Sequence, residues 1–242
     1  MHYAYATEPI MITFSDDIDK VIFDGKWSFY TEWKHSSLDT FSYDDGTVVE
    51  FRSAHQGNFI YIFADAITQS DFTKRSDYAM ICFDGNDSKM ILPDANDYCF
   101  MSVLNGNSFA YQGNSSLGFN DNFKMIPNPT GFIGVGGISD KNDRYTDVPH
   151  SGYEFRIPTS TVGRSSSYGF FFVMYNTHFN KYYSWPQNVT IDGPFKIPSP
   201  SVWGDLISPD QSLPEFPWPI IAMALSFTIV LFTAKRFRIH IK

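Results

Sequence analysis

The chain has 242 residues, of which 18 are lysine or arginine and 26 are aspartate or glutamate, giving a formal net charge of -8 at pH 7. Four of the basic residues follow Ala234, so residues 1–216 carry about -12, which argues against nucleic acid or an anionic lipid surface as a partner. Charged residues make up 18% of the chain and aromatic residues another 18%, which excludes a disordered protein and supplies a sizeable apolar core.

Residues 1–9 lack an export signal of the usual form, since they have neither a cationic n-region nor an apolar h-region. Ala4, Tyr5 and Ala6 do fit the small-x-small pattern of a signal-peptidase site. We therefore expect residues 1–9 to be the remaining end of an export signal or an N-terminal arm. The alternative is that this match is chance and that the C-terminal apolar segment acts as a tail anchor, which would leave the domain in the cytoplasm.

Residues 10–192 consist of short runs rich in aromatic and β-branched residues, separated by clusters of Gly, Asn and Asp. Regular short strands with such punctuation are typical of an antiparallel β-sandwich, and helical periodicity is nearly absent. The sequence Asn105-Gly106-Asn107 between two runs predicts a tight hairpin. We expect strands at residues 48–51, 59–64, 78–83, 98–104, 108–112, 153–157, 168–175 and 181–185.

Cys82 and Cys99 lie in two separate predicted strands. If these strands are neighbours, a disulfide closing a loop of about 17 residues would stabilise the domain by about 3 kcal/mol in the chain-entropy model, and it would agree with export. Two free buried thiols are the alternative. Sequons that avoid proline occur at Asn86, Asn114 and Asn188, in sequence typical of surface turns and strand ends, and are candidates for N-glycosylation.

Closely spaced carboxylate and amide side chains offer the hard oxygen ligands that calcium prefers, at Asp84, Asn86 and Asp87 or within residues 16–19. Neither run fits the EF-hand pattern, so solvated turn residues are the alternative. The six histidines show no paired spacing, which leaves a zinc or copper centre unsupported. Gly-x-Ser-x-Gly and phosphate-loop patterns are also absent from the sequence, which favours a protein that is not an enzyme.

Several motifs, in this order, resemble the β-sandwich superfamily that contains carbohydrate-binding module family nine and the haem-binding subunit of ethylbenzene-dehydrogenase-like enzymes. They are an Asp-Gly … Trp hairpin in residues 19–33, the strand-Asp motif at residues 82–84, Tyr-Glu-Phe-Arg-Ile-Pro at 153–158, Gly-Phe-Phe-Phe at 169–172 and Ser-Trp-Pro at 184–186. The resemblance covers about residues 10–190 and implies the sandwich. Because one sandwich hosts several ligand classes, it leaves sugar, calcium and haem as alternative ligands.

Sugar binding by modules of this kind uses exposed aromatic faces, on which the apolar face of a pyranose stacks. Trp27, Trp33 and Trp185 are the indoles of the predicted domain, but their places in the framework motifs favour burial. A freer aromatic cluster surrounds the predicted hairpin at residues 176–178. The candidate ligand-binding residues are therefore Tyr175, Phe179, Tyr182, Tyr183 and Trp185.

The haem alternative requires axial ligands, which the resemblance implies to be a methionine and a lysine from loops at one end of the sandwich. By residue type the candidates are Met90 or Met101 with Lys181. The sequence has no Cys-x-x-Cys-His motif, which excludes covalent c-type haem. The corresponding function would be a haem-binding electron-transfer accessory subunit of a membrane-facing oxidoreductase.

Seven prolines fall between Pro194 and Pro219, which predicts a semi-rigid extended stalk over residues 193–216 with no room for a sheet. Residues 217–234 form an uncharged run of about 18 residues, long enough for a single transmembrane helix. The basic tail at residues 235–242 places the C-terminus in the cytoplasm and the domain outside the cell membrane. A buried helix of the globular core is the alternative.

Pro214, Glu215 and Phe216 stand directly before the apolar run. A Pro-Glu-Phe motif, one hydrophobic span and a basic end together resemble the C-terminal sorting signals that archaeal and bacterial exosortase-type transpeptidases recognise, which implies removal of the span after export. A plain membrane anchor is the alternative. The sequence as a whole predicts an archaeal-type, surface-anchored, non-catalytic binding module for carbohydrate or a surface glycan.

Overall fold

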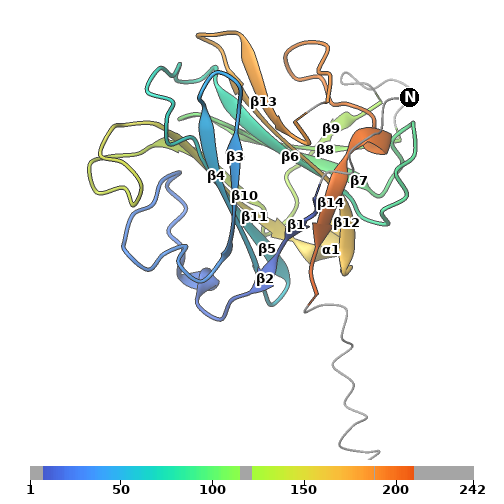
Figure 1. Ribbon diagram of the computed structural model, residues 1–242. Helices are drawn as coiled ribbons and strands as arrows, with labels where there is room; N and C mark the ends of the chain where they lie inside the picture. The colour runs from blue at the N-terminus through green and yellow to red at the C-terminus, as the bar shows by residue number, and fades with distance from the viewer. Residues whose placement is uncertain (1–7, 115–121, 188, 210–242) are drawn as a thin grey trace, which may run out of the picture.

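The computed structural model describes residues 8–114, 122–187 and 189–209, which fold into two β-sheets packed face to face (Figure 1). The prediction of an all-β sandwich is confirmed for these residues. Their helical segments are single turns: η1 (Ile18–Lys20), α1 (Thr159–Val162) and η2 (Pro200–Val202). No helix in the described ranges is long and apolar enough to cross a membrane.

The larger sheet has eight strands in the order β1-β14-β12-β6-β7-β8-β9, with β13 also paired to β12. All its pairs are antiparallel except β1 with β14. Its strands are β1 (Ile10–Met11), β6 (Tyr78–Asp84), β7 (Asp97–Val103), β8 (Ser108–Gln112), β9 (Lys124–Ile126), β12 (Ser167–Asn176), β13 (Lys181–Trp185) and β14 (Gly204–Ile207).

The smaller sheet has six strands in the order β10-β11-β5-β4-β2, with β3 also paired to β4. Its strands are β2 (Thr13–Phe14), β3 (Ser37–Ser42), β4 (Val48–Gln56), β5 (Phe59–Asp65), β10 (Ile133–Ile138) and β11 (Ser151–Pro158). Every run predicted as a strand coincides with an observed strand. The predicted hairpin also forms, because residues 104–107 join β7 to β8 and the Val103 N–H donates to the Asn107 carbonyl.

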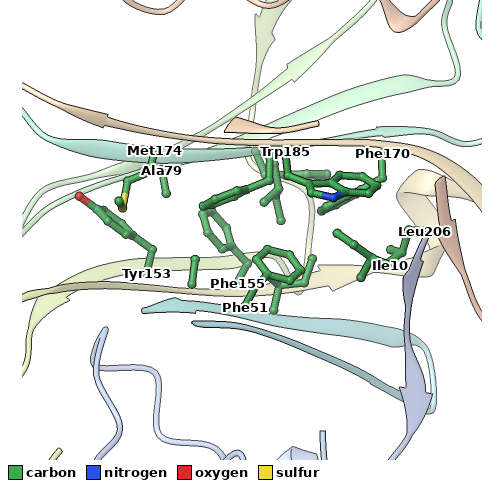
Figure 2. Packing of buried hydrophobic residues seen from close by; sticks show 14 of the residues in the cluster. Ile10, Phe51, Ala79, Tyr153, Phe155, Phe170, Met174, Trp185 and Leu206 are labelled. Atoms are coloured by element: carbon green, nitrogen blue, oxygen red, sulfur yellow. The ribbon is translucent and has the colours of Figure 1, made fainter. Parts of the chain in front are cut away.

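The main core lies between the two sheets. Figure 2 shows Phe51 and Phe155 of the smaller sheet facing Phe170, Met174 and Ala79 of the larger one. Successive side chains of a strand point to opposite faces, so alternate residues of β4, β11, β6 and β12 enter this layer. Burying one large apolar side chain contributes about 1.5–3 kcal/mol, which makes this layer the main source of stability.

The larger sheet is apolar on its outer face as well. Residues of β6 and β12 that point away from the main core, such as Met80, Phe171 and Val173, form a second buried cluster. Residues 189–203 run over this face, where Ile197 and Trp203 are buried. The Trp203 ring lies 6.3 Å from the Phe171 ring and nearly parallel to it. Both faces of this sheet are therefore covered by apolar packing.

This cover corrects the predicted stalk over residues 193–216. Its first part, residues 193–209, belongs to the domain, and residues 204–207 form β14, which pairs with both β12 and β1. The prolines of this stretch end at Pro200 and resume at Pro209, so the four residues of β14 have every N–H that a strand needs. Residues 210–216 lie outside the described ranges.

Cys82 and Cys99 face each other across the β6–β7 pair and are joined by a disulfide with a sequence separation of 17 residues. Both are fully buried in the outer cluster. The other terminal predictions fall outside the described residues: the sorting motif at 214–216, the span at 217–234, the tail at 235–242, residues 1–7 of the N-terminal segment, and Asn188.

Candidate functional site

One buried carboxylate holds the opening loop of the domain against the smaller sheet. Glu154 of β11 accepts hydrogen bonds from the Gly25 N–H at 2.7 Å, the Asp24 N–H at 2.8 Å and the Trp33 indole Nε1–H at 3.0 Å. Gly25 has a φ of +80°, and a Cβ there would lie 2.0 Å from the Gly137 nitrogen, so only glycine fits. The opening Asp-Gly … Trp motif and the later Tyr-Glu motif thus meet at one side chain.

A second carboxylate shapes the loop itself. Glu32 accepts hydrogen bonds from the Ile22 N–H at 2.9 Å and the Ser28 N–H at 2.5 Å, which closes residues 22–32 into a compact loop. Burial raises the pKa of the Glu32 carboxyl above its ordinary value, although these two N–H groups act in the opposite direction. The loop therefore presents residues 27–30 in a fixed arrangement.

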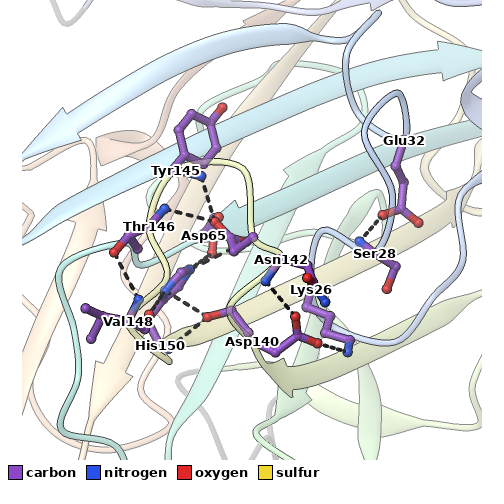
Figure 3. Close-up of polar contacts among 12 residues, drawn as sticks. Lys26, Ser28, Glu32, Asp65, Asp140, Asn142, Tyr145, Thr146, Val148 and His150 are labelled. Atoms are coloured by element: carbon purple, nitrogen blue, oxygen red, sulfur yellow. Dashed lines mark hydrogen bonds and ion pairs between the residues drawn. The ribbon is translucent and has the colours of Figure 1, made fainter.

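The segment between β10 and β11, residues 139–150, lies beside this loop (Figure 3). Lys26 joins the two segments, because its Nζ lies 2.7 Å from Asp140 Oδ2. Asp143 Oδ1 accepts from the Tyr145 N–H at 2.8 Å and more weakly from the Thr146 N–H at 3.4 Å. These contacts give the second segment a defined turn at residues 143–146.

A pocket of about 630 Å³ lies between the two segments. Its aromatic side chains include Tyr30, which is 71% exposed, and Trp27, which is almost buried. The Arg144 guanidinium carbon lies 5.2 Å from the centre of the Trp27 ring and 5.8 Å from that of Tyr30. The pocket thus combines an exposed aromatic side chain with hydrogen-bonding groups, and its lining is Trp27, Ser28, Phe29, Tyr30, Asn142, Asp143, Arg144 and Tyr145. We call it the loop pocket.

Arg52 of β4 packs against the Trp27 ring. The Arg52 guanidinium lies 5.0 Å from the centre of the Trp27 ring, and it donates to the Tyr145 hydroxyl at 2.9 Å and the Trp33 carbonyl at 3.1 Å. Because Arg52 contacts Trp27 in one segment and Tyr145 in the other, these two rings of the loop pocket have a common anchor. The pocket is therefore largely preformed.

A buried polar cluster lies behind the residue 143–146 turn. His150 Nε2 is 2.7 Å from Asp65 Oδ1 and 3.9 Å from Asp143 Oδ2. Burial raises the pKa of Asp65 to about 6, and the Asp65 carboxylate raises the pKa of His150 although burial of the imidazole opposes this. Within the described ranges, these three residues are the one group of His, Cys, Asp and Glu side chains spaced to meet at a metal ion.

The predicted aromatic cluster is divided by the structure. Tyr183 and Trp185 face the main core and are 1% and 5% exposed, whereas Tyr182 points to the other face of β13 and stacks on Tyr175 at 4.7 Å. Phe179 is 54% exposed in the β12–β13 hairpin. Strand alternation therefore divides these five candidates between different faces, so they do not form one cluster, and sugar binding by any of them stays a prediction. Burial of Trp27, Trp33 and Trp185, the preferred interpretation of their framework positions, is confirmed.

The carboxylates of the acidic turn at residues 84–89 accept hydrogen bonds from the protein itself. The Asp84 carboxylate is fully buried and accepts from the Lys89 N–H at 2.7 Å and the Asn86 N–H at 3.3 Å, while Asp87 Oδ2 accepts from the Ser167 hydroxyl at 2.8 Å. The side chains thus order the turn by themselves, and calcium at this place stays a prediction. Asn86 and Asn114 are exposed, as glycosylation acceptors must be.

The predicted haem ligands have other environments. Lys181 pairs with Asp45 at 2.6 Å, Met101 is buried in the outer cluster, and Met90 is 54% exposed in the turn after β6. A larger pocket of about 770 Å³ lies on the outer face of the larger sheet, with a lining that includes Met101 and Phe109. Its surface is mainly apolar, with Arg75, Asn105 and Asn107 as polar members, so it offers fewer hydrogen-bonding groups than the loop pocket.

Asp97 gives the domain a pH-dependent stability. It lies beside Asp84 in the β6–β7 pair, and burial, with smaller contributions from Asp84 and Asp94, raises its pKa to about 7. In the unfolded chain an aspartate loses its proton near pH 4. The folded state therefore binds more protons between about pH 4 and 7, so its contribution to the free energy of unfolding falls as pH rises through this window.

Asp97→Asn is accordingly expected to flatten the dependence of the urea midpoint on pH between 4 and 7. The amide oxygen can still accept from the Asp94 N–H, which Asp97 Oδ2 accepts at 2.6 Å. Asp94→Asn, at a more accessible position of the same turn, is the matched control and should leave most of the slope. An unchanged slope in Asp97→Asn would contradict the assignment of this proton to Asp97.

Comparison with known proteins gives structural neighbours. No protein-family model and no curated protein sequence matches the chain. A carbohydrate-binding module of family 9 from Caldicellulosiruptor kristjanssonii in complex with cellotriose is similar, with a TM-score of 0.54, 12% identity, and coverage of 83% of this chain and 93% of that one. A structure of such a module from the same organism in complex with glucose gives a TM-score of 0.50, 14% identity, and coverage of 83% and 95%. At these identities the likeness shows a shared fold.

Proposed function

We propose that this domain is a non-catalytic carbohydrate-binding module and that the loop pocket is its sugar site. The observation that carries the proposal is the lining of this pocket, which places exposed aromatic surface beside amide, hydroxyl and guanidinium groups. The fold supports it, because the similar modules were solved with cellotriose and with glucose.

Tyr30 is the ring on which a pyranose would stack, because it is the most exposed aromatic side chain of the pocket. The apolar face of a sugar covers such a ring, while its hydroxyl groups need donors and acceptors around the edge. Arg144 and the Asn142 amide NH₂ supply donors, and the Ser28 hydroxyl and the Asn142 amide oxygen supply acceptors. No bond of the sugar has to break, so the pocket needs no nucleophile or general acid.

The setting of the module is part of the same proposal. An uncharged run at residues 217–234 followed by four basic residues supports a single-pass anchor with the domain outside the cell membrane. Pro214, Glu215 and Phe216 support recognition by a sorting transpeptidase. An external domain would meet surface or environmental glycans, and its acidic composition does not favour nucleic acid.

Tyr30→Ala tests the site. Calorimetric titration of the full chain with glucose and with cellotriose should show binding to the wild type, and the variant should bind about 5- to 30-fold more weakly, since loss of a stacking ring costs roughly 1–2 kcal/mol. The exposed ring predicts an unchanged melting temperature. Phe179→Ala is the matched control, because Phe179 is a similarly exposed aromatic residue outside the pocket.

The outcomes separate the candidate sites. Loss of binding in Phe179→Ala with normal binding in Tyr30→Ala would move the site to the β12–β13 hairpin. Loss only in Phe109→Ala would move it to the larger apolar pocket. If neither glucose, cellotriose nor a panel of other oligosaccharides binds the folded wild type, the proposed function is wrong.

A further inference from the structure

We propose that Asp65, Asp143 and His150 form a binding site for a divalent transition metal ion, with Zn²⁺ as the preferred ion. Asp65 ends β5, His150 directly precedes β11, and Asp143 comes from the turn between β10 and β11. Figure 3 shows His150 and Asp65 pointing toward each other beside this turn. One ligand atom from each of the three residues lies within 4.8 Å of the others. The proposal does not depend on sugar binding.

The imidazole is oriented as a ligand. Its Nδ1 lies 2.8 Å from the Val148 carbonyl oxygen, which can only accept, so Nδ1 carries the hydrogen. The Ser139 hydroxyl lies 2.8 Å from the same nitrogen and also accepts from the His150 N–H at 2.9 Å. Nε2 is thereby directed at the two carboxylates. A histidine that binds a metal through one ring nitrogen commonly donates the other N–H to a backbone carbonyl in this way.

Two carboxylate oxygens at this place accept no hydrogen bond. The side chains of Asp65 and Asp143 are 0% and 1% exposed, so solvent does not reach them. Their Oδ2 atoms nevertheless accept no hydrogen bond from the protein. An unpaired buried acceptor destabilises the folded state, and a charged one does so more strongly. Two carboxylates around one imidazole also leave the cluster with an excess of negative charge. A divalent cation would satisfy both the unpaired oxygens and this charge.

The donor set selects the type of ion. Calcium and magnesium prefer oxygen ligands throughout, whereas Zn²⁺ is bound by imidazole nitrogen together with carboxylate oxygen. Ligands of one zinc ion lie roughly 3–4 Å from each other. The observed distances from His150 Nε2 are 2.7 Å to Asp65 Oδ1 and 3.9 Å to Asp143 Oδ2, so small side-chain movements would admit the ion. The ion would replace the proton now shared between His150 and Asp65.

The site would link three parts of the domain. Asp143 also lines the loop pocket, and its other oxygen Oδ1 holds the Tyr145 N–H. An ion bound to Asp65 and His150 on one side and Asp143 on the other would therefore fix the residue 143–146 turn to β5 and β11. We expect the metal to act as a structural tie behind the pocket wall.

The test uses the full chain after treatment with a chelator and its removal. Titration with Zn²⁺ should give one bound ion per chain by elemental analysis. It should raise the melting temperature by roughly 5–10 °C at a free zinc concentration a hundredfold above the Kd. Co²⁺ in place of Zn²⁺ should give visible absorption bands that report a mixed nitrogen and oxygen site.

Asp143→Asn is the decisive variant, because its amide oxygen can still accept from the Tyr145 N–H and so preserve the turn. It should lower the zinc affinity at least about 100-fold. Asp140→Asn is the matched control, because Asp140 lies three residues away and pairs with the half-buried Lys26 rather than with His150. The zinc affinity of this variant should stay within about twofold of that of the wild type. Circular dichroism checks that both variants fold.

Three results would overturn the proposal. The first is a folded wild type that takes up no zinc and shows no thermal shift. The second is stabilisation by Ca²⁺ without stabilisation by Zn²⁺. The third is equal zinc affinity in Asp143→Asn and the wild type, which would place the bound ion on another histidine.

Discussion

Trp185→Ala is expected to lower the free energy of unfolding by about 3–5 kcal/mol, because it removes a large side chain from a closely packed core. Trp185 is 5% exposed, and its ring lies 6.1 Å from the Phe170 ring and 6.3 Å from the Phe41 ring. It also fills the space beside Gly204, where a Cβ would come within 2.3 Å of the indole. Domains of this size have a total stability of about 5–15 kcal/mol, so the loss would be a large part of it.

Urea denaturation followed by tryptophan fluorescence and circular dichroism measures this loss. Phe179→Ala is the matched control, since Phe179 is more than half exposed and its replacement should change the free energy of unfolding by less than about 0.5 kcal/mol. A Trp185→Ala domain as stable as the wild type would contradict the core position. If that stable variant had also lost sugar binding, the result would indicate that Trp185 contacts the ligand.

Most of the sandwich could be predicted from the sequence because its central strands carry apolar side chains on both faces. Residues 78–83 and 168–175 are apolar throughout, and the structure shows why: β6 and β12 lie next to each other in the middle of a sheet that is covered on both faces. The turn between β7 and β8 could likewise be predicted from its own residues, Asn105, Gly106 and Asn107. Such features need no knowledge of distant residues.

The stretch after residue 192 could not be predicted in this way. The prolines of residues 193–209 indicate an extended chain, which is correct for the backbone outside the turns at residues 193–196 and 200–202, but an extended chain can also lie on a sheet or enter it. Ile197 and Trp203 were the available signal, because large apolar side chains are unexpected on an exposed stalk. The outer face of β6 and β12 needed a cover, and the sequence pattern of those strands alone does not say which segment provides it.

The loop pocket and the metal cluster depend on residues that are distant in the sequence. Asp65 and His150 are 85 positions apart, and their contact depends on the pairing of β5 with β11. A search for closely spaced histidines therefore missed the group. Tyr30 and Arg144 likewise meet only because Glu154, Glu32 and Lys26 hold two loops together. The opening Asp-Gly … Trp motif and the Tyr-Glu motif suggested a shared framework. In the structure both motifs meet at the Glu154 carboxylate.

That carboxylate predicts the second large effect. Glu154→Ala should lower the free energy of unfolding by at least about 3 kcal/mol, because it leaves the Asp24 N–H, the Gly25 N–H and the Trp33 indole N–H without their acceptor, and each unpaired buried donor costs about 1–3 kcal/mol. Glu50→Gln is a suitable control for loss of a carboxylate in general, since Glu50 lies on β4 and, among the described residues, its carboxylate accepts from one threonine hydroxyl at 2.8 Å.

Glu154→Gln separates the loss of the titratable proton of this side chain from the loss of its hydrogen-bond acceptors. The amide oxygen can accept from Asp24 and Gly25, but the amide NH₂ then faces the Trp33 N–H, so we expect a stability between those of the wild type and the alanine variant. Burial, opposed by the hydrogen bonds from Gly25 and Trp33, raises the pKa of Glu154 well above its ordinary value. The folded wild type therefore holds a proton that the unfolded chain loses near pH 4 to 5, and its stability falls as pH rises above that range.

Urea denaturation at pH 5 and pH 7.5 tests both parts of this argument. The difference in stability between the wild type and Glu154→Gln should be smaller at pH 7.5, because only the wild type loses stability through this group as pH rises. A constant difference would show that Glu154 is already ionised at pH 5. Full stability of Glu154→Ala would mean that the opening loop is held by packing around Gly25 and Trp33, and that the shared carboxylate contributes little.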